Sequence, residues 1–409
     1  MNKLESVKSY KIINSRGDWT IRTEIQLKDG SVGVSTIPEG ASKGEREAIE
    51  LPAEKAAYNV QNKIFPVIKD FDPYDQCKID NVMIGLDGTE LKSNLGGNSI
   101  LSVSLAIARA CANSRKLPLY KYIAEHYGTT KAVSDGIKFP TPLFNVINGG
   151  KHAQNNLSFQ EFMVIPSRNM NIEKALELGV NVYDSLKDLL HKDNYSTGVG
   201  DEGGFAPSDF TVHKALDYIK KAIGTSYKIG TEVFFGTDVA AESFYNKGNY
   251  EIKEEDKKLS REQLLDYYKE LVSEYPFILV EDPYYEKDIP GWMEFTKEFE
   301  GKLIVVADDL VVTNPKILTE VIEKKLATGV IVKPNQVGTL SETLDFIKKA
   351  KSNGMAVIVS HRSGDTGEDT FISDLGVAVG ADFIKAGAPD RGERVVKYNR
   401  LLEIYHSHK

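Results

Sequence analysis

Only two of the 409 residues are cysteines, Cys77 and Cys111. Two thiols in a chain of this length exclude the disulfide framework that stabilises small secreted domains. Long hydrophobic runs are also missing: no apolar segment reaches the length that crosses a bilayer, and residues 1–16 contain no apolar signal segment. We therefore expect a cytoplasmic protein without a membrane span, in which Cys111 is a small core residue.

The chain also has no excess of positive charge. Lys and Arg number 51 against 59 Asp and Glu, which gives a net charge of −8 and a pI near 5.6. Both signs are mixed along the whole sequence. Because a nucleic-acid surface requires a basic stripe, the charge argues against nucleic-acid binding, and we expect no nucleic-acid partner.

The length allows two domains, since a β/α barrel takes about 250 residues and leaves enough chain for a second domain of ordinary size. A stretch with glycine, threonine and proline, from Tyr127 to Pro142, separates two kinds of sequence pattern. We expect an N-terminal domain over residues 1–133 and a C-terminal domain over residues 134–409.

The first domain has the pattern of an α+β structure. Residues 20–27 and 32–37 alternate apolar and polar side chains around Lys28-Asp29-Gly30, which predicts a β-hairpin. Residues 46–62 and 99–112 carry apolar side chains at helical spacing, which predicts two helices.

Six short apolar runs in the second domain each end at a charged or hydrogen-bonding residue. Because helix-like stretches separate these runs at intervals of roughly 25 to 45 residues, the runs indicate parallel strands. An open doubly wound sheet would give the same local pattern. Carboxylates come first and cations last, which favours a barrel whose strand ends surround one mouth. The terminal residues of the six runs are Asp238, Glu281, Asp308, Lys333, Ser360 and Lys385.

The segment from Gly198 to Gly203 matches the dinucleotide fingerprint GxGxxG, but we reject this interpretation. The fingerprint requires a strand before it and a helix that opens at it. Here the preceding residues form a weak strand pattern, Gly204 and Pro207 occupy the expected helix, and two carboxylates within the loop would repel a pyrophosphate.

Asp238, Glu281 and Asp308 form the strongest constellation, because neighbouring strand ends would bring their carboxylates together. Two such charges about 5 Å apart repel by roughly 3 kcal/mol at an effective dielectric near 20. An all-oxygen ligand set at a substrate pocket suits Mg²⁺. The alternative is that these acids are surface residues paired with lysines.

The remaining candidates are a base, an anion site and a carboxylate pair. Lys333, beside metal ions and a second lysine, should have a depressed pKa and act as a base; a plain salt bridge to Asp308 or Asp309 is the alternative. Arg362 and Ser363 suit a phosphate or a carboxylate. Glu161 and Glu202 can form a pair in which one carboxyl holds its proton near neutral pH, while His152 alone suggests only a surface loop.

The order of these motifs along the chain resembles the enolase family. The series runs nearly from end to end and consists of Ser15-Arg16-Gly17, Gly40-Ala41-Ser42, Asp87-Gly88-Thr89-Glu90, Asn148-Gly149-Gly150-Lys151-His152-Ala153, Gln160-Glu161-Phe162-Met163, Gly200-Asp201-Glu202-Gly203-Gly204, Glu281-Asp282-Pro283, Asp308-Asp309-Leu310, Lys333-Pro334-Asn335-Gln336 and Ser360-His361-Arg362-Ser363-Gly364. The resemblance implies an α/β protein with an α+β N-terminal domain and an irregular β/α barrel of the enolase type. It also implies a homodimer or homo-octamer.

The activity that the resemblance implies is the Mg²⁺-dependent dehydration of 2-phosphoglycerate to phosphoenolpyruvate, and the reverse, in glycolysis and gluconeogenesis. Two Mg²⁺ ions per active site are implied, of which the second is less firmly indicated. The resemblance implies that Lys333 is the base, that Glu202 is the acid with support from Glu161, and that His152 lies in a closing loop. The implied substrate-binding residues are Gln160, His361, Arg362, Ser363 and Lys385. The implied ligands of the first Mg²⁺ are Asp238, Glu281 and Asp308, and Ser42 is implied to contact the second.

The chain departs from the family pattern in the loop around Ser42, where Glu39 and Lys43 introduce charges. These changes bear on the second metal and on loop closure. Two alternatives therefore stay open: a catalytically silent enolase-like binding protein, and another proton-abstracting enzyme of the superfamily that acts on a different carboxylate. Retention of Lys333 and Glu202 argues against the first alternative, and the pair Arg362 and Ser363 argues against the second.

Overall fold

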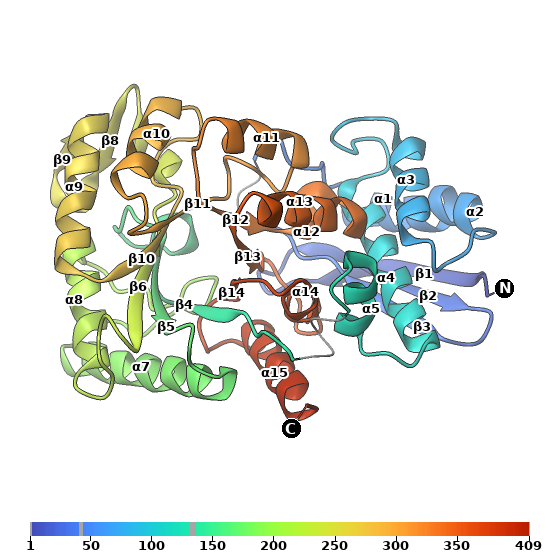
Figure 1. Cartoon of the computed structure of the whole chain (residues 1–409), viewed down its shortest axis with the longest axis horizontal. Helices are drawn as coiled ribbons and strands as arrows, with labels where there is room; N and C mark the ends of the chain where they lie inside the picture. Colours follow the sequence, from blue (N-terminus) through green and yellow to red (C-terminus); the bar gives the residue numbers. More distant parts are fainter. Residues whose placement is uncertain (1, 41–43, 131–135, 409) are drawn as a thin grey trace.

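The computed structural model describes residues 2–40, 44–130 and 136–408 (Figure 1). Its N-terminal part is a three-stranded antiparallel sheet in the order β1-β2-β3, with helix α4 packed against β2 and β3. Figure 1 shows this part at one end of the molecule and the barrel at the other. The elements of the N-terminal part are β1 Leu4–Ile13, β2 Trp19–Leu27, β3 Val32–Thr36, α1 Ala53–Asn59, α2 Phe65–Ile68, α3 Gln76–Asp87, α4 Gly97–Ser114 and α5 Leu119–Tyr127, with a π-helical turn at Val60–Ile64 between α1 and α2.

The predicted hairpin is confirmed by β2 and β3. Asp29 Oδ1 accepts a hydrogen bond from the backbone N–H of Ser31 at 2.9 Å, and Gly30 adopts a φ of +87° that closes the turn. Ile21 and Ile25 of β2 are fully buried. Period-2 alternation therefore identified the face of the sheet that packs on α4.

One of the two predicted N-terminal helices is correct and the other is partly wrong. Residues 99–112 lie in α4, as expected. Residues 46–62 are not one helix, because Pro52 occupies the N-cap of α1 with extended backbone angles, φ −48° and ψ 137°. Proline is tolerated at a helix start but not in its interior, so the helix begins only at Ala53.

The C-terminal part is a closed eight-stranded barrel in the order β10-β11-β12-β13-β14-β4-β5-β6. All neighbouring strands are parallel except that β5 runs antiparallel to both β4 and β6. Closure confirms the predicted barrel and excludes the open sheet. The strands are β4 Thr141–Asn148, β5 Glu161–Pro166, β6 Val233–Asp238, β10 Phe277–Glu281, β11 Ile304–Ala307, β12 Gly329–Val332, β13 Ala356–Ser360 and β14 Phe383–Lys385.

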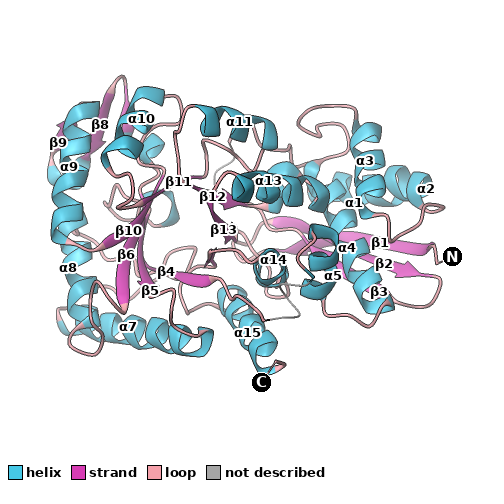
Figure 2. Cartoon of the chain, viewed as in Figure 1, coloured by secondary structure: helices cyan, strands magenta, loops and turns pink. Residues whose placement is uncertain are grey.

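Helices surround the barrel, and most of them follow a strand (Figure 2). They are α7 Ile172–Lys192, α8 Val212–Ile223, α9 Arg261–Glu274, α10 Ile289–Glu298, α11 Pro315–Glu323, α12 Pro334–Val337, α13 Leu340–Ser352, α14 Phe371–Val379 and α15 Gly392–His406. A small antiparallel sheet of β7 Tyr245–Asn246, β8 Asn249–Ile252 and β9 Lys257–Leu259 follows β6. Single 3-10 turns lie at Gly150–His152, Ala241–Phe244 and Lys253–Glu255.

Two further expectations are met along this part of the chain. The segment from Gly198 to Gly203 forms a loop, and the next helix, α8, opens only at Val212, so the dinucleotide motif is absent there. Among the described residues, no helix has both the length and the apolar character needed to cross a membrane.

The expected domain boundary after residue 133 lies outside the described residues.

A layer of large apolar side chains fills the barrel below its mouth. Seven of the strands contribute fully buried residues to this layer, and Phe234 of the remaining strand, β6, packs against them. The fully buried members are Leu143, Met163, Ile165, Leu279, Val306, Ile331, Ile358 and Phe383. A barrel filled in this way is a rigid support for residues at the strand ends.

We predict that Ile331→Ala destabilises the protein by about 2–5 kcal/mol, because it leaves a cavity in this closed layer. Urea denaturation followed by circular dichroism measures the change. Met293→Ala in α10, whose side chain is 49% exposed, is the control and should change stability by no more than about 0.5 kcal/mol. A loss below about 1 kcal/mol for Ile331→Ala would contradict the role given to the layer.

Candidate active site

The polar residues that end the strands meet at one mouth of the barrel. Asp238 and Glu281 are register partners at the ends of β6 and β10, and Ser360 and Lys385 are partners at the ends of β13 and β14. Glu161 is the first residue of β5, yet it also lies at this mouth because β5 is antiparallel, and it pairs in register with Asp238.

A pocket opens at this mouth. Eleven of the thirteen predicted site residues line it. They are His152, Gln160, Glu161, Glu202, Asp238, Asp308, Lys333, His361, Arg362, Ser363 and Lys385. Of the other two, Glu281 is fully buried against Lys385, and Ser42 lies outside the described residues.

Lys385 is the cation around which the predicted carboxylates gather. Its Nζ lies 3.1 Å from Asp238 Oδ2, 2.9 Å from Glu281 Oε2 and 3.1 Å from Glu161 Oε1. All four side chains are at most 5% exposed. Burial alone would lower the pKa of Lys385, but Asp238, Glu161 and Glu281 outweigh burial and hold the pKa of Lys385 well above its usual value.

Lys333 does not have the depressed pKa that the sequence suggested. Its Nζ is paired with Asp308 Oδ2, and Gln336 donates a hydrogen bond to Asp308 Oδ1 at 3.1 Å. Burial alone would lower the pKa of Lys333, but the charge of Asp308 outweighs burial and raises it. The salt bridge that was the alternative for Lys333 is therefore present.

Arg362 is held by the N-terminal part of the chain. Its Nη1 lies 2.9 Å from Glu47 Oε2, and both side chains are buried. Gly40 packs so closely on the guanidinium that a Cβ there would lie 1.8 Å from Nη2. Glu39 and Gly364 exchange two backbone hydrogen bonds, of 2.7 and 2.8 Å, which fasten this loop to the segment that follows β13.

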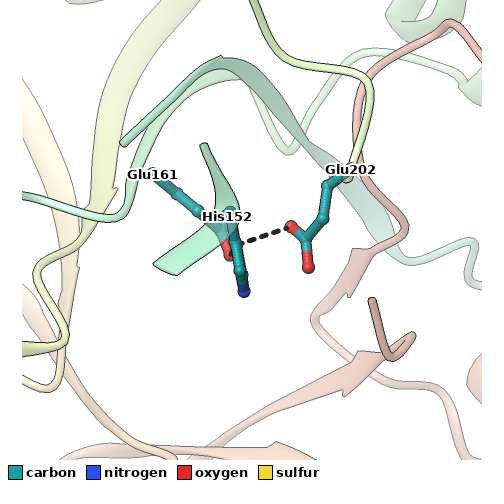
Figure 3. Close-up of side chains that lie close together, drawn as sticks. All are labelled: His152, Glu161 and Glu202. Atoms are coloured by element: carbon teal, nitrogen blue, oxygen red, sulfur yellow. Dashed lines mark ion pairs between the residues drawn. The ribbon is translucent and has the colours of Figure 1, made fainter. Parts of the chain in front are cut away.

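His152 and two carboxylates form a compact group (Figure 3). His152 Nδ1 lies 3.4 Å from Glu161 Oε1 and 3.5 Å from Glu202 Oε2. Asn145 donates to Glu202 Oε2 at 3.1 Å, and His361 Nε2 lies 3.4 Å from the same oxygen. His152 is therefore part of the buried site and not a surface loop residue.

The surroundings shift the pKa values of Glu161 and Glu202 in opposite directions. Burial and the charge of Glu202 raise the pKa of Glu161 to about 7. Burial would also raise the pKa of Glu202, but the imidazoles of His152 and His361 outweigh burial and hold the pKa of Glu202 well below its usual range. The two carboxyls titrate as a coupled pair, and these surroundings favour the proton on Glu161 over Glu202.

Comparisons with known proteins agree with this architecture. The family description "Enolase, N-terminal domain" matches residues 4–123, and "Enolase, C-terminal TIM barrel domain" matches residues 136–407. A curated relative named "Enolase", from a Nitratiruptor species, is 42% identical over 412 residues and covers 98% of this chain and 96% of its own length. The chain belongs to the enolase family. The predicted enzyme class, a lyase, is confirmed with the family.

The carboxylates of this enolase-family site can hold a metal ion. Asp282, Asp308 and Asp309 place carboxylate oxygens within 4.8 Å of one another, a set that differs from the predicted Asp238, Glu281 and Asp308. Asp282 accepts backbone hydrogen bonds from Asp308 and Asp309 at 3.0 Å each, so it orients its neighbours. Burial and neighbouring charge raise the pKa of Asp309 to about 7 and that of Glu281 well above its usual range. An all-oxygen set with this concentration of negative charge fits a hard divalent cation.

Sequence reasoning missed three side chains that shape the site: Glu47, Asp282 and Arg394. Asp282 could have been identified, because it lies between a strand end and a proline in the Glu-Asp-Pro motif. Glu47 and Arg394 lie in helix-like or loop patterns far along the chain from their partners. No local spacing indicates those contacts.

Proposed function

We propose that the protein catalyses the dehydration of 2-phosphoglycerate to phosphoenolpyruvate, and the reverse reaction, with Mg²⁺. The observation that carries this proposal is the arrangement of a lysine and a carboxylate pair around one pocket. Lys333 follows β12 and Glu161 begins β5, and these strands are four positions apart in the ring of eight. A base and an acid on opposite walls can remove a proton and protonate a leaving hydroxyl on opposite faces of one substrate.

In this mechanism Lys333 takes the proton from the carbon next to the substrate carboxylate. Asp308 raises the pKa of Lys333, so Lys333 can act as a base only when Asp308 no longer pairs with its Nζ. Glu161, which holds the proton of the resting pair, supports Glu202 by supplying that proton to it, and Glu202 delivers it to the departing hydroxyl. Lys385 would stabilise the charge that develops on the carboxylate of the substrate.

The phosphate of the substrate would bind Arg362 and Ser363, with Gln160 and His361 as further substrate-binding residues. Arg362 offers a planar fork of donors that suits a phosphate. Its partner Glu47 fixes the side chain at the pocket wall. Binding of a phosphate would require Arg362 to share its donors between the ligand and Glu47.

Asp238, Glu281 and Asp308 would hold the first Mg²⁺, and Ser42, outside the described residues, would contribute to the second. When bound, Mg²⁺ supplies positive charge that stabilises the doubly negative enolate. The family membership also supports a cytoplasmic location and a homodimer or homo-octamer. We expect Glu39 and Lys43 to pair with each other or with a neighbouring chain and not to block the pocket.

The first test is direct. Purified protein with Mg²⁺ and 2-phosphoglycerate should produce phosphoenolpyruvate, followed by ultraviolet absorbance. Absence of turnover across a wide range of Mg²⁺ concentrations would reject the proposal and favour the enolase-like binding protein. Turnover of another carboxylate but not of 2-phosphoglycerate would favour a different member of the superfamily.

Lys333→Ala should lower kcat by about 10²- to 10⁴-fold, the range expected for loss of a general base. Substrate affinity, measured by calorimetry, should change much less because the phosphate and metal groups remain. The control is Lys316→Ala in α11, whose side chain is 84% exposed. Near-normal turnover of Lys333→Ala would show that another group is the base.

Mg²⁺ should raise the melting temperature, because a ligand that binds only the folded state stabilises it by about 2.7 kcal/mol at 100 times its Kd. Glu281→Gln should reduce this shift strongly, since it removes one of the proposed ligands. Glu242→Gln, an exposed residue of the pocket rim, is the matched control and should keep the shift. An equal shift in both variants would exclude Glu281 as a ligand.

A further inference from the structure

Arg394 in α15 is a fully buried cation whose contacts converge on the segment after β13. Its guanidinium lies 2.6 Å from His361 Nδ1. It also donates hydrogen bonds to the backbone oxygens of Arg362 at 2.8 Å, Ser363 at 2.6 Å and Asp201 at 3.0 Å. These contacts fix the guanidinium, so the contact with His361 is part of a rigid arrangement.

The contact with Arg394 determines the protonation state of His361. A guanidinium has donors only, so His361 Nδ1 must accept this hydrogen bond and carries no proton. The ring is then neutral, with its hydrogen on Nε2. An imidazolium would place an N–H opposite the N–H of Arg394, which is unfavourable in a buried site.

The other ring nitrogen faces the candidate catalytic acid. His361 Nε2 lies 3.4 Å from Glu202 Oε2, and both side chains are at most 4% exposed. The closest approaches of Asn145 and His152 to Glu202 are to the same oxygen. Asn145, His152 and His361 therefore all approach Oε2 of Glu202. Oε1 of Glu202 is then the oxygen left for a transferable proton.

We propose that Arg394 is a positioning residue that acts on Glu202 through His361. By occupying Nδ1, Arg394 confines the imidazole to the neutral tautomer with its hydrogen on Nε2. His361 then faces Glu202 Oε2 with its Nε2–H at 3.4 Å but cannot exchange protons with it. Proton transfer by Glu202 is thereby directed to Oε1 and the substrate. Only the role of Glu202 rests on the proposed function; the tautomer of His361 does not.

The other charged groups around His361 agree with a neutral ring. Burial, together with Arg394 and Lys397, lowers the pKa of His361 to about 3, although Glu202 acts in the opposite direction. Lys397 itself lies 2.7 Å from Asp365, which also lies 3.6 Å from Arg394. On the far side of Glu202, His152 and Glu161 complete the charged surroundings.

The tautomer can be measured without any turnover. Long-range ¹H–¹⁵N spectra of protein labelled with ¹⁵N-histidine distinguish a protonated from an unprotonated ring nitrogen. The chain has seven histidines, so the signal of His361 is assigned by its loss in His361→Gln. We expect Nε2 protonated, Nδ1 unprotonated and no titration between pH 5 and 8. A proton on Nδ1 at pH 7 would overturn the proposal, whether or not the protein turns over 2-phosphoglycerate.

Arg394→Met tests the consequence for catalysis. We expect His361 to titrate between pH 5 and 8 in this variant and kcat to fall by about 10- to 100-fold, the scale of a misplaced catalytic group. KM should change by less than about threefold. Arg394→Lys keeps a donor and should restore part of kcat and suppress the titration.

Two comparisons separate positioning from a merely structural role. In a His361→Gln background, Arg394→Met should add no new pH dependence, because no imidazole is left to titrate. Arg400→Met, on the same helix and paired with Asp374, should leave the tautomer and the pH profile unchanged. A pH profile of Arg394→Met identical to that of the wild type would reject the proposal. If Arg394→Met fails to fold, the tautomer of the wild-type protein and the Arg394→Lys profile still decide it.

Discussion

The excess of buried carboxylates over cations at the barrel mouth is the constraint on which the rest of the site depends. Glu161, Asp238 and Glu281 meet at the single ammonium of Lys385, while Asp308 takes Lys333 as its partner. At an effective dielectric near 20, two ionised carboxylates about 5 Å apart would repel by roughly 3 kcal/mol. Burial and this repulsion together raise the pKa values of Glu161 and Glu281. Only a rigid scaffold keeps such groups together, and the closed barrel with its filled apolar layer supplies that rigidity. The same repulsion makes the mouth receptive to a divalent cation.

The N-terminal part completes this site with contacts of both backbone and side chain. Glu47 neutralises Arg362, and the paired backbones of Glu39 and Gly364 join the loop after β3 to the segment after β13. Arg16 reaches Asp201 at 2.7 Å, so the loop that carries the candidate acid is also tied to the N-terminal part. The barrel alone therefore provides the carboxylates and lysines, whereas the orientation of the phosphate-binding arginine depends on both parts of the chain.

Much of this arrangement could be predicted from sequence because parallel strands of a barrel end at one mouth. The polar residue at each strand end was sufficient to predict that Asp238, Glu281 and Lys333 lie at one mouth. The prediction of one helix over residues 46–62 was wrong because it followed the apolar spacing and gave no weight to Pro52, which marks the observed helix start. The pKa direction of Lys333 was also not predictable, since it depends on which carboxylate oxygen lies against Nζ. Contacts such as Glu47 with Arg362 span 315 residues, and no local pattern encodes them.

The carboxylate pair explains why a buried arginine is useful so close to the site. Glu202 is already stabilised as an anion by His152 and His361, while Glu161 holds the proton. A positively charged imidazole at His361 would lower the pKa of Glu202 further and make Glu202 a weaker base and a poorer proton carrier. Arg394 prevents this without entering the pocket, because its donors leave His361 only the neutral form. Placing the charge one residue away from Glu202 thus leaves a neutral N–H facing the carboxylate and avoids an ion pair between His361 and Glu202.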